Sequence, residues 1–126
     1  MKILVIGSGG REHAIVDAIS RNSHVKQIYV APGNGGTAGP AVNVPIAADN
    51  VTALRDFARD EKVYLTFVGP EVPLSLGVVD LFRSSGLKIV GPDAENAKLE
   101  SSKTYSKQFF KAHNIPTADF WPCATM

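Results

Sequence analysis

The sequence predicts an α/β fold, in which a parallel β-sheet carries helices on both of its faces. Short apolar runs alternate along the chain with longer segments of helical periodicity, which is typical of repeated strand–helix units. The runs are continuously apolar rather than alternating, as expected of strands that are buried on both sides. Each run also stops abruptly at glycine or proline, so that every strand end is followed by a loop.

The predicted elements follow this alternation from the first residues onward. A helix is assigned where apolar residues recur every three or four positions, as Ala14, Ile15, Ala18 and Ile19 do, or where a capping residue precedes such a pattern. In chain order, the elements are a strand at 3–6, a helix at 10–21, a strand at 27–31, a helix opened by Asn50 that carries Val51, Leu54, Phe57 and Ala58 inward, a strand at 64–68, a helix at 72–85, a strand at 87–90, and two short helices opened by Asp93 and by Ser101 or Ser102.

Length, composition and charge narrow the class of protein. The 126 residues are 44% hydrophobic and 20% charged, so the chain can bury a core, and its formal net charge of +1 argues against a dedicated nucleic-acid binder. The single cysteine, Cys123, cannot form an internal disulfide, and the sequence shows neither a signal peptide nor a membrane-spanning run. These features predict a cytoplasmic protein without nucleic-acid or membrane partners.

The first candidate ligand-binding segment is the loop Gly7-Ser8-Gly9-Gly10 between the first strand and the first helix. Such a loop lets a ligand approach the backbone, and the free N–H groups at a helix start attract anions; a tight turn without a ligand is the alternative interpretation. A dinucleotide fingerprint needs a glycine at position 12, where the chain has Glu12, and an acidic residue after the second strand, where it has Ala31. NAD binding is therefore disfavoured.

Two further loops follow strand ends and carry polar side chains. Asn34, after the second strand, offers an amide to a sugar or phosphate, or else stabilises a turn. Glu71, after the third strand, has the position of a carboxylate that holds both hydroxyls of a ribose, or else of an acid that stabilises a helix N-terminus. Because the carboxyl ends of parallel strands share one edge of the sheet, all three loops should face one crevice.

At this level of detail the sequence resembles the N-terminal region of the glycinamide ribonucleotide synthetases, also called phosphoribosylamine–glycine ligases, of the ATP-grasp superfamily. Taken singly the matching motifs occur in other ATP-grasp enzymes, but their order and spacing are specific to this family. The segments that carry the resemblance are residues 2–14, 31–38, 68–74, 77–80, 86–92 and 99–103.

The resemblance implies a Rossmann-like, pre-ATP-grasp N-terminal domain and the second step of purine biosynthesis. In that step ATP phosphorylates glycine, and the amine of 5-phosphoribosylamine displaces the phosphate to give glycinamide ribonucleotide. Carried over residue by residue, Gly9, Gly10, Asn34 and Glu71 bind phosphoribosylamine, and Lys103 matches a basic residue that reaches nucleotide phosphate. The substrates are small molecules, and ATP with Mg or Mn is bound outside this chain.

The resemblance also implies that residues 1–100 are the substrate-binding domain and that residues 101–126 are a linker and the truncated start of the ATP-grasp domain. On this interpretation the chain has the rest of its own polypeptide as a partner, contains no catalytic residue or metal site, and is inactive by itself. The closest alternative is the corresponding domain of a carboxyaminoimidazole ribonucleotide enzyme or a biotin carboxylase. A nicotinamide-binding domain and a ligand-free interaction module are the remaining alternatives.

Overall fold

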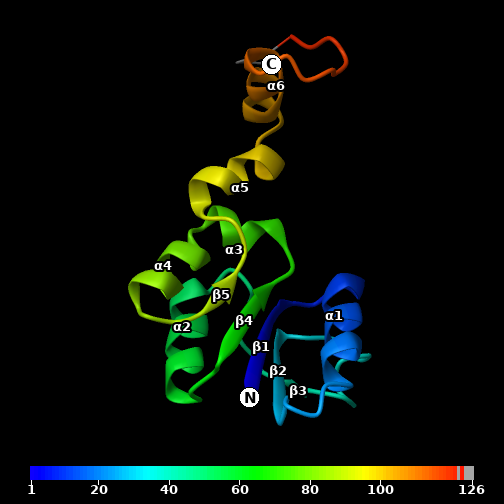
Figure 1. Cartoon of the computed structure of the whole chain (residues 1–126), viewed down its shortest axis with the longest axis vertical. Coiled ribbons are helices and arrows are strands. Elements are labelled where there is room, and N and C mark those ends of the chain that lie inside the picture. The colour runs from blue at the N-terminus through cyan, green and yellow to red at the C-terminus, as the bar shows by residue number, and fades with distance from the viewer. Residues whose placement is uncertain (122, 124–126) are drawn as a thin grey trace.

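The computed structural model describes residues 1–121 and 123, which form a parallel sheet surrounded by helices (Figure 1). This confirms the predicted α/β class. The elements in chain order are β1 (Lys2–Gly7), α1 (Gly10–Ser20), β2 (Gln27–Pro32), β3 (Val42–Asn43), α2 (Val51–Asp60), β4 (Leu65–Val68), α3 (Glu71–Ser75), α4 (Val78–Ser84), β5 (Ile89–Val90), α5 (Ala94–Ser101) and α6 (Lys103–Ala112).

The sheet has the strand order β3-β2-β1-β4-β5, and every adjacent pair is parallel. β1 lies at the centre, with β2 on one side and β4 on the other. Its register places Ile6 opposite both Ala31 and Val68, so these three strands end at nearly the same level. The loops that follow them are therefore neighbours at one edge of the sheet, as the sequence predicts.

Each face of the sheet has its own apolar core. Leu4 and Ile6 of β1 point into the larger core, which α2, α3 and α4 cover with Leu54, Leu74 and the fully buried Phe82. Ile3 and Val5 point to the opposite face, which α1 covers with Val16. Figure 1 shows α1 on one side of the strands and α2 and α4 on the other. Helices on both faces explain why the strands are continuously apolar.

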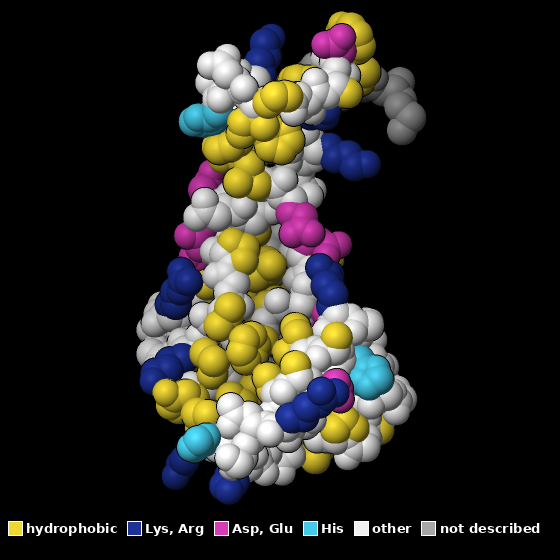
Figure 2. Space-filling model, turned by 45° about the vertical axis from the view of Figure 1, so that its right-hand side comes forward, with side chains coloured by type: hydrophobic (Ala, Val, Ile, Leu, Met, Phe, Trp, Pro, Cys, Tyr) yellow, Lys and Arg dark blue, Asp and Glu magenta, His cyan; other side chains and the backbone are white. Residues whose placement is uncertain are grey.

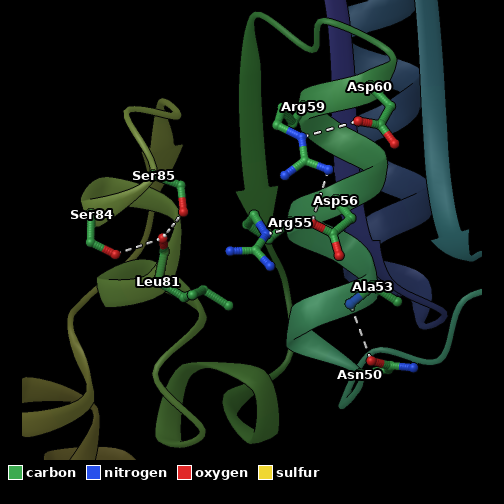
Figure 3. Close-up of polar contacts among 9 residues, drawn as sticks. All are labelled: Asn50, Ala53, Arg55, Asp56, Arg59, Asp60, Leu81, Ser84 and Ser85. Carbon is green, nitrogen blue, oxygen red and sulfur yellow. Dashed lines mark hydrogen bonds and ion pairs between the residues drawn. The ribbon is translucent and has the colours of Figure 1, made fainter.

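The helix predicted after Asn50 is confirmed as α2. The side chain of Asn50 accepts a hydrogen bond from the amide of Ala53 at 3.2 Å, which satisfies one free N–H of the first turn (Figure 3). The outer surface carries ion pairs of Asp56 with Arg55 at 2.8 Å and with Arg59 at 3.2 Å. α2 is thus a strongly amphipathic helix whose apolar side faces the larger core.

Three elements differ from those predicted. The single helix expected at 72–85 is two helices, α3 and α4, because Gly77 between them has a left-handed backbone with φ of +79°. β3 was not predicted at all, since two residues cannot show a periodic pattern. β5 comprises only the last two residues of the strand expected at 87–90.

The two C-terminal helices extend away from the sheet. Asp93 and Ser102 cap α5 and α6 as predicted, accepting hydrogen bonds from the amides of Asn96 and Tyr105. α5 packs on α3, and α6 packs on α5 (Figure 1). In the view of Figure 2, hydrophobic side chains form a strip from the sheet region to this end of the molecule.

The proposed domain boundary at residue 100 falls within α5, and residues 122 and 124–126 of the second segment lie outside the described residues. Among the described residues, no helix has the length and apolar character needed to cross a membrane.

A polar cluster fixes the opposite edge of the sheet, at the amino ends of the strands. One carboxylate oxygen of Glu61 accepts hydrogen bonds from Lys2 Nζ and from the Tyr29 hydroxyl, each at 2.8 Å. The bond from Lys2, followed by the bond from Tyr29, lowers the pKa of Glu61 below its ordinary value of 4.5. The same contact with Glu61 raises the pKa of Lys2 and of Tyr29.

We expect Glu61→Gln to lower the free energy of unfolding at pH 7 and to matter less in acid. A carboxylate whose pKa is lowered by folding stabilises the protein above its ordinary pKa of 4.5, and this contribution is lost as the pH falls through the lowered value. Urea unfolding of both proteins between pH 7 and pH 3 should show the gap between them closing. A gap that is independent of pH would mean that the charge of Glu61 is not what stabilises this edge.

Candidate functional site

A pocket of about 530 Å³ lies at the carboxyl edge of the sheet. It is formed where the loop after β1 meets the loop after β4, and it is completed by Pro32 at the end of β2 and by residues 47–49. Gly9, from the loop after β1, and Glu71, at the start of α3, both line it. The structure thus brings together two of the residues predicted from the sequence. A second hollow, of about 560 Å³, lies between α6 and residues 114–121, and no predicted site residue lines it.

Glu12 is a residue of this pocket that sequence reasoning did not assign to a site. It lies in the first turn of α1, yet it is only 3% exposed. Its Oε2 accepts a hydrogen bond from the Gly9 amide at 2.5 Å, in the manner of a capping box. Its Oε1 has no hydrogen-bond partner among the described residues. A buried carboxylate therefore lies at the helix start, and one of its two oxygens has no hydrogen-bond donor among the described residues.

Two glycines make the room for this carboxylate. A Cβ atom at Gly69 would lie 1.8 Å from Oε1 of Glu12, and a Cβ at Gly7 would lie 2.7 Å from its Cδ. Gly7 also has a φ of +129°, which L-residues rarely adopt. Gly7, which ends β1, and Gly69, which follows β4, are thus required by the side chain of Glu12, and not only by a turn.

The buried position of Glu12 rotates α1 relative to the predicted helix. The sequence pattern assigned Ala14, Ile15, Ala18 and Ile19 to the inner face, but Ala14 and Ala18 are exposed. Glu12 and Val16 are buried instead, with Ile15 and Ile19 half-buried beside them. Periodicity analysis counts apolar residues only, so it could not assign a charged residue to the buried face.

Glu71 is the first residue of α3 and lies half-exposed in the pocket wall. Arg11 approaches it, with 3.7 Å between Nη2 and Oε2, and Nε of the same arginine lies 3.9 Å from Oε1 of Glu12. These distances are long, and the Arg11 side chain is 63% exposed, so the ion pairs add little stability. Glu71 is thus only weakly held by Arg11.

Asn34 lies beside the pocket and joins two of the three loops. Its Nδ2 donates to the carbonyl oxygens of Ser8 at 2.9 Å and Gly9 at 3.3 Å, and its Oδ1 accepts from the amides of Gly36 at 2.8 Å and Thr37 at 3.1 Å. Asn34 is not among the residues that line the pocket. In this structure its amide therefore fixes the loop after β1 on the loop after β2.

We expect Asn34→Ala to lower the free energy of unfolding by about 2 kcal/mol, because it removes side-chain bonds to four backbone groups, some of which water can replace. The amide signals of Ser8, Gly9 and Gly10 should broaden or shift in the NMR spectrum, since the loop loses its anchor. Thermal unfolding and a ¹H–¹⁵N correlation spectrum measure the two effects. Unchanged Ser8 and Gly9 signals in a folded variant would refute the anchoring role.

The other two predicted residues are placed differently. Gly10 begins α1 next to the pocket but does not line it, and a Cβ added there meets nothing within 4 Å. Lys103 is an exposed residue at the start of α6, in the part of the molecule that extends away from the sheet (Figure 1). The structure therefore does not bring Lys103 into this pocket.

The pocket lining is acidic. Glu12, Asp49 and Glu71 contribute carboxylates, and Arg11 contributes the one cation among the lining residues. Among residues 1–121 and 123, no group of three or more His, Cys, Asp or Glu side chains has the geometry to hold a metal ion. The lining suits a ligand that donates hydrogen bonds through hydroxyl or amino groups more than it suits an anion.

Comparison with known proteins identifies relatives of this architecture. The family model described as "Phosphoribosylglycinamide synthetase, N domain" matches residues 1–100. A phosphoribosylamine–glycine ligase of Escherichia coli O6:H1 is 56% identical over 122 residues, and one of Chlorobaculum tepidum is 51% identical over 123 residues; the matches cover 95% of this chain. The crystal structure of the Thermotoga maritima phosphoribosylamine–glycine ligase superposes with a TM-score of 0.69 at 29% identity and covers 94% of this chain.

More distant solved structures share the fold alone. The biotin carboxylase domain of a 2-oxoglutarate carboxylase has a TM-score of 0.67 at 18% identity, so it supports the architecture but no site assignment. The chain spans 28–29% of the length of the two curated relatives and 26% of the Thermotoga maritima chain. The match of the family model over residues 1–100, together with identity above 50%, shows that this chain belongs to the phosphoribosylglycinamide synthetase N-domain family.

Proposed function

We propose that the pocket at the carboxyl edge of the sheet binds the sugar of 5-phosphoribosylamine for a ligase that joins this amine to glycine. The observation that carries the proposal is the meeting of the Gly9 loop and Glu71 in one pocket. A carboxylate that follows a strand is well placed to accept hydrogen bonds from two adjacent ribose hydroxyls. The names and the high identity of the relatives supply the substrate.

In this function the residues of the chain bind and orient the sugar phosphate and catalyse no bond change themselves. Glu71 holds the ribose, Gly9 and Gly10 allow close approach of the backbone, and Asn34 keeps their loop in place. A sugar held in one orientation presents its amine to the activated glycine with less loss of entropy. We place ATP and its divalent metal elsewhere in a longer enzyme, because this chain spans only 28–29% of the length of the curated ligases that it matches. Lys103, which is remote from this pocket, is proposed only as a contact to nucleotide in that enzyme.

A second candidate function is sugar-phosphate binding in a carboxyaminoimidazole ribonucleotide enzyme. A synthetase of that class from Thermotoga maritima shares the fold at 18% identity. The identity above 50% to the glycine ligases favours the first proposal. A dinucleotide domain is disfavoured further, because the buried Glu12 occupies the position where the fingerprint needs glycine for close packing of helix on strand.

A backbone-amide NMR titration with ribose 5-phosphate, a stable analogue of phosphoribosylamine, tests the proposal. We expect saturable shifts at Gly9, Gly10 and Glu71, and no shifts there with NAD at equal concentration. Shifts with NAD alone would overturn the proposal in favour of a dinucleotide domain. A site response to neither compound would also count against it.

We expect Glu71→Gln to weaken ribose 5-phosphate binding about tenfold, the scale of losing a charge-assisted hydrogen bond in a half-exposed position. The variant should unfold at the same urea concentration as the parent, since Glu71 makes only a long ion pair. Glu95→Gln is the matched control, because Glu95 lies exposed on α5 and pairs with Lys98. Equal affinities of the Glu71 variant and the control would remove Glu71 from the site.

A further inference from the structure

Glu12 changes what the start of α1 can bind. The N-terminus of a helix normally presents free N–H groups and a partial positive charge, and it attracts phosphate groups. Here the amide of Gly9, the residue that caps α1, already donates to Oε2 of Glu12 at 2.5 Å. The carboxylate thus takes up part of the positive potential that would otherwise draw an anion to this helix.

The second oxygen of Glu12 is a buried atom packed against the backbone of Gly69. The Glu12 side chain is 4% exposed and lines the pocket, and Oε1 has no hydrogen-bond partner among the described residues. The nearest cationic group is Nε of Arg11, at 3.9 Å, on a side chain that is mostly in solvent. A buried carboxylate oxygen without a donor is costly, and an anion brought close to it would raise that cost.

The other charges of the pocket act in the same direction. Asp49 and Glu71 add two carboxylates to the lining, against the single cation of Arg11. Like charges repel more strongly near a buried site than in open solvent, because the effective dielectric constant is lower there. A phosphate placed at the start of α1 would face the charge of Glu12 with little solvent between them.

We propose that Glu12 determines the specificity of this pocket: through its charge it excludes phosphate from the start of α1. A sugar phosphate then binds with its phosphate directed away from α1. The substrate class rests on the proposed function above, whereas the exclusion of anions by Glu12 does not. Glu12 acts on ligand specificity through the charge of its carboxylate, which is held in one position. The glycines at positions 7, 9 and 69 leave the space that this side chain occupies.

The test compares inorganic pyrophosphate binding to the parent chain, to Glu12→Gln and to Asp17→Asn, by NMR shifts of the Gly9, Gly10 and Arg11 amides at fixed ionic strength. Glutamine keeps an oxygen that accepts from the Gly9 amide but lacks the charge. We expect Glu12→Gln to bind pyrophosphate at least about tenfold more tightly than the parent. Asp17→Asn makes the same change in net charge at the exposed Asp17–Arg21 pair of the same helix and should behave as the parent does. Equal pyrophosphate affinity of a folded Glu12→Gln and the parent would overturn the proposal.

Two further arms keep the test decisive. Saturable pyrophosphate shifts of the parent at Gly9 and Gly10 would overturn the proposal even if Glu12→Gln does not fold. Ribose 5-phosphate in the parent addresses the proposed function separately: a lack of response there refutes sugar-phosphate binding, while the pyrophosphate comparison still decides the role of Glu12. A merely structural Glu12 would change stability but would leave the pyrophosphate affinity of a folded Glu12→Gln equal to that of the parent.

Discussion

Gly7→Ala should destabilise the chain by about 4 kcal/mol, from an unfavourable backbone conformation and from overpacking, each of which costs roughly 1–3 kcal/mol. Gly7 has a φ of +129°, and an added Cβ would lie 2.7 Å from Glu12 and 2.9 Å from Cδ of Pro70. Backbone strain and steric conflict therefore coincide at the end of the central strand. A loss of this size is a large part of the roughly 5–15 kcal/mol that stabilises an ordinary domain.

Urea unfolding followed by circular dichroism measures this effect, with Gly10→Ala as the control. Gly10 lies three residues further along the chain, at the start of α1; it has no positive φ, and a Cβ added there meets no atom within 4 Å. Alanine there should be neutral or slightly stabilising, since it is the better helix former. Similar unfolding midpoints for the two variants would show that the conformation of Gly7 is not a constraint on this fold.

The sheet edge that carries the site could be predicted from sequence with good accuracy. β1, β2 and β4 are continuous apolar runs that end at glycine or proline, and parallel strands with helical connections must end at a common edge. This reasoning was sufficient to place Gly9 and Glu71 in one pocket. It needed only the order and the ends of the strands, which local pattern determines.

Features that depend on tertiary packing were not predictable in the same way. Gly77 was counted as part of a helix, although its left-handed backbone separates α3 from α4. Asn34 was predicted either to bind a sugar or phosphate or to stabilise a turn, and its position in the sequence could not show that its side chain hydrogen-bonds four loop backbone groups. Neither a φ value nor a hydrogen-bond partner is encoded in the type of a single residue.

Glu12 was the most consequential omission, because a charged residue in the first turn of a helix is usually exposed and stabilises the helix dipole. Its burial becomes visible only when Gly7 and Gly69, 62 positions apart in the sequence, are found on either side of it. The available signal was the excess of glycine at both strand ends, which turn chemistry also explains. Steric complementarity between glycines and one carboxylate needs three-dimensional contacts to be recognised.

Gly69→Ala should cost about 3 kcal/mol in the parent, because overpacking is joined by loss of the bond between Glu12 and the Gly9 amide. The backbone of Gly69 does not have a positive φ, so the effect isolates the steric conflict with the carboxylate. Thermal or urea unfolding measures it. Gly39→Ala is the control, since Gly39 also lacks a positive φ and has no atom within 4 Å of an added Cβ.

The same substitution made in a Glu12→Ala background separates the proposed cause from a general effect of alanine at this turn. With the carboxylate gone, the Cβ added at position 69 enters space that Glu12 occupied, and the cost should fall below about 1 kcal/mol, which gives a strong coupling between the two positions. An equal cost in both backgrounds would mean that Gly69 serves the turn alone. Strong coupling would show that the strand ends of β1 and β4 are shaped around one buried carboxylate, and that the glycines of this edge and Glu12 form a single unit.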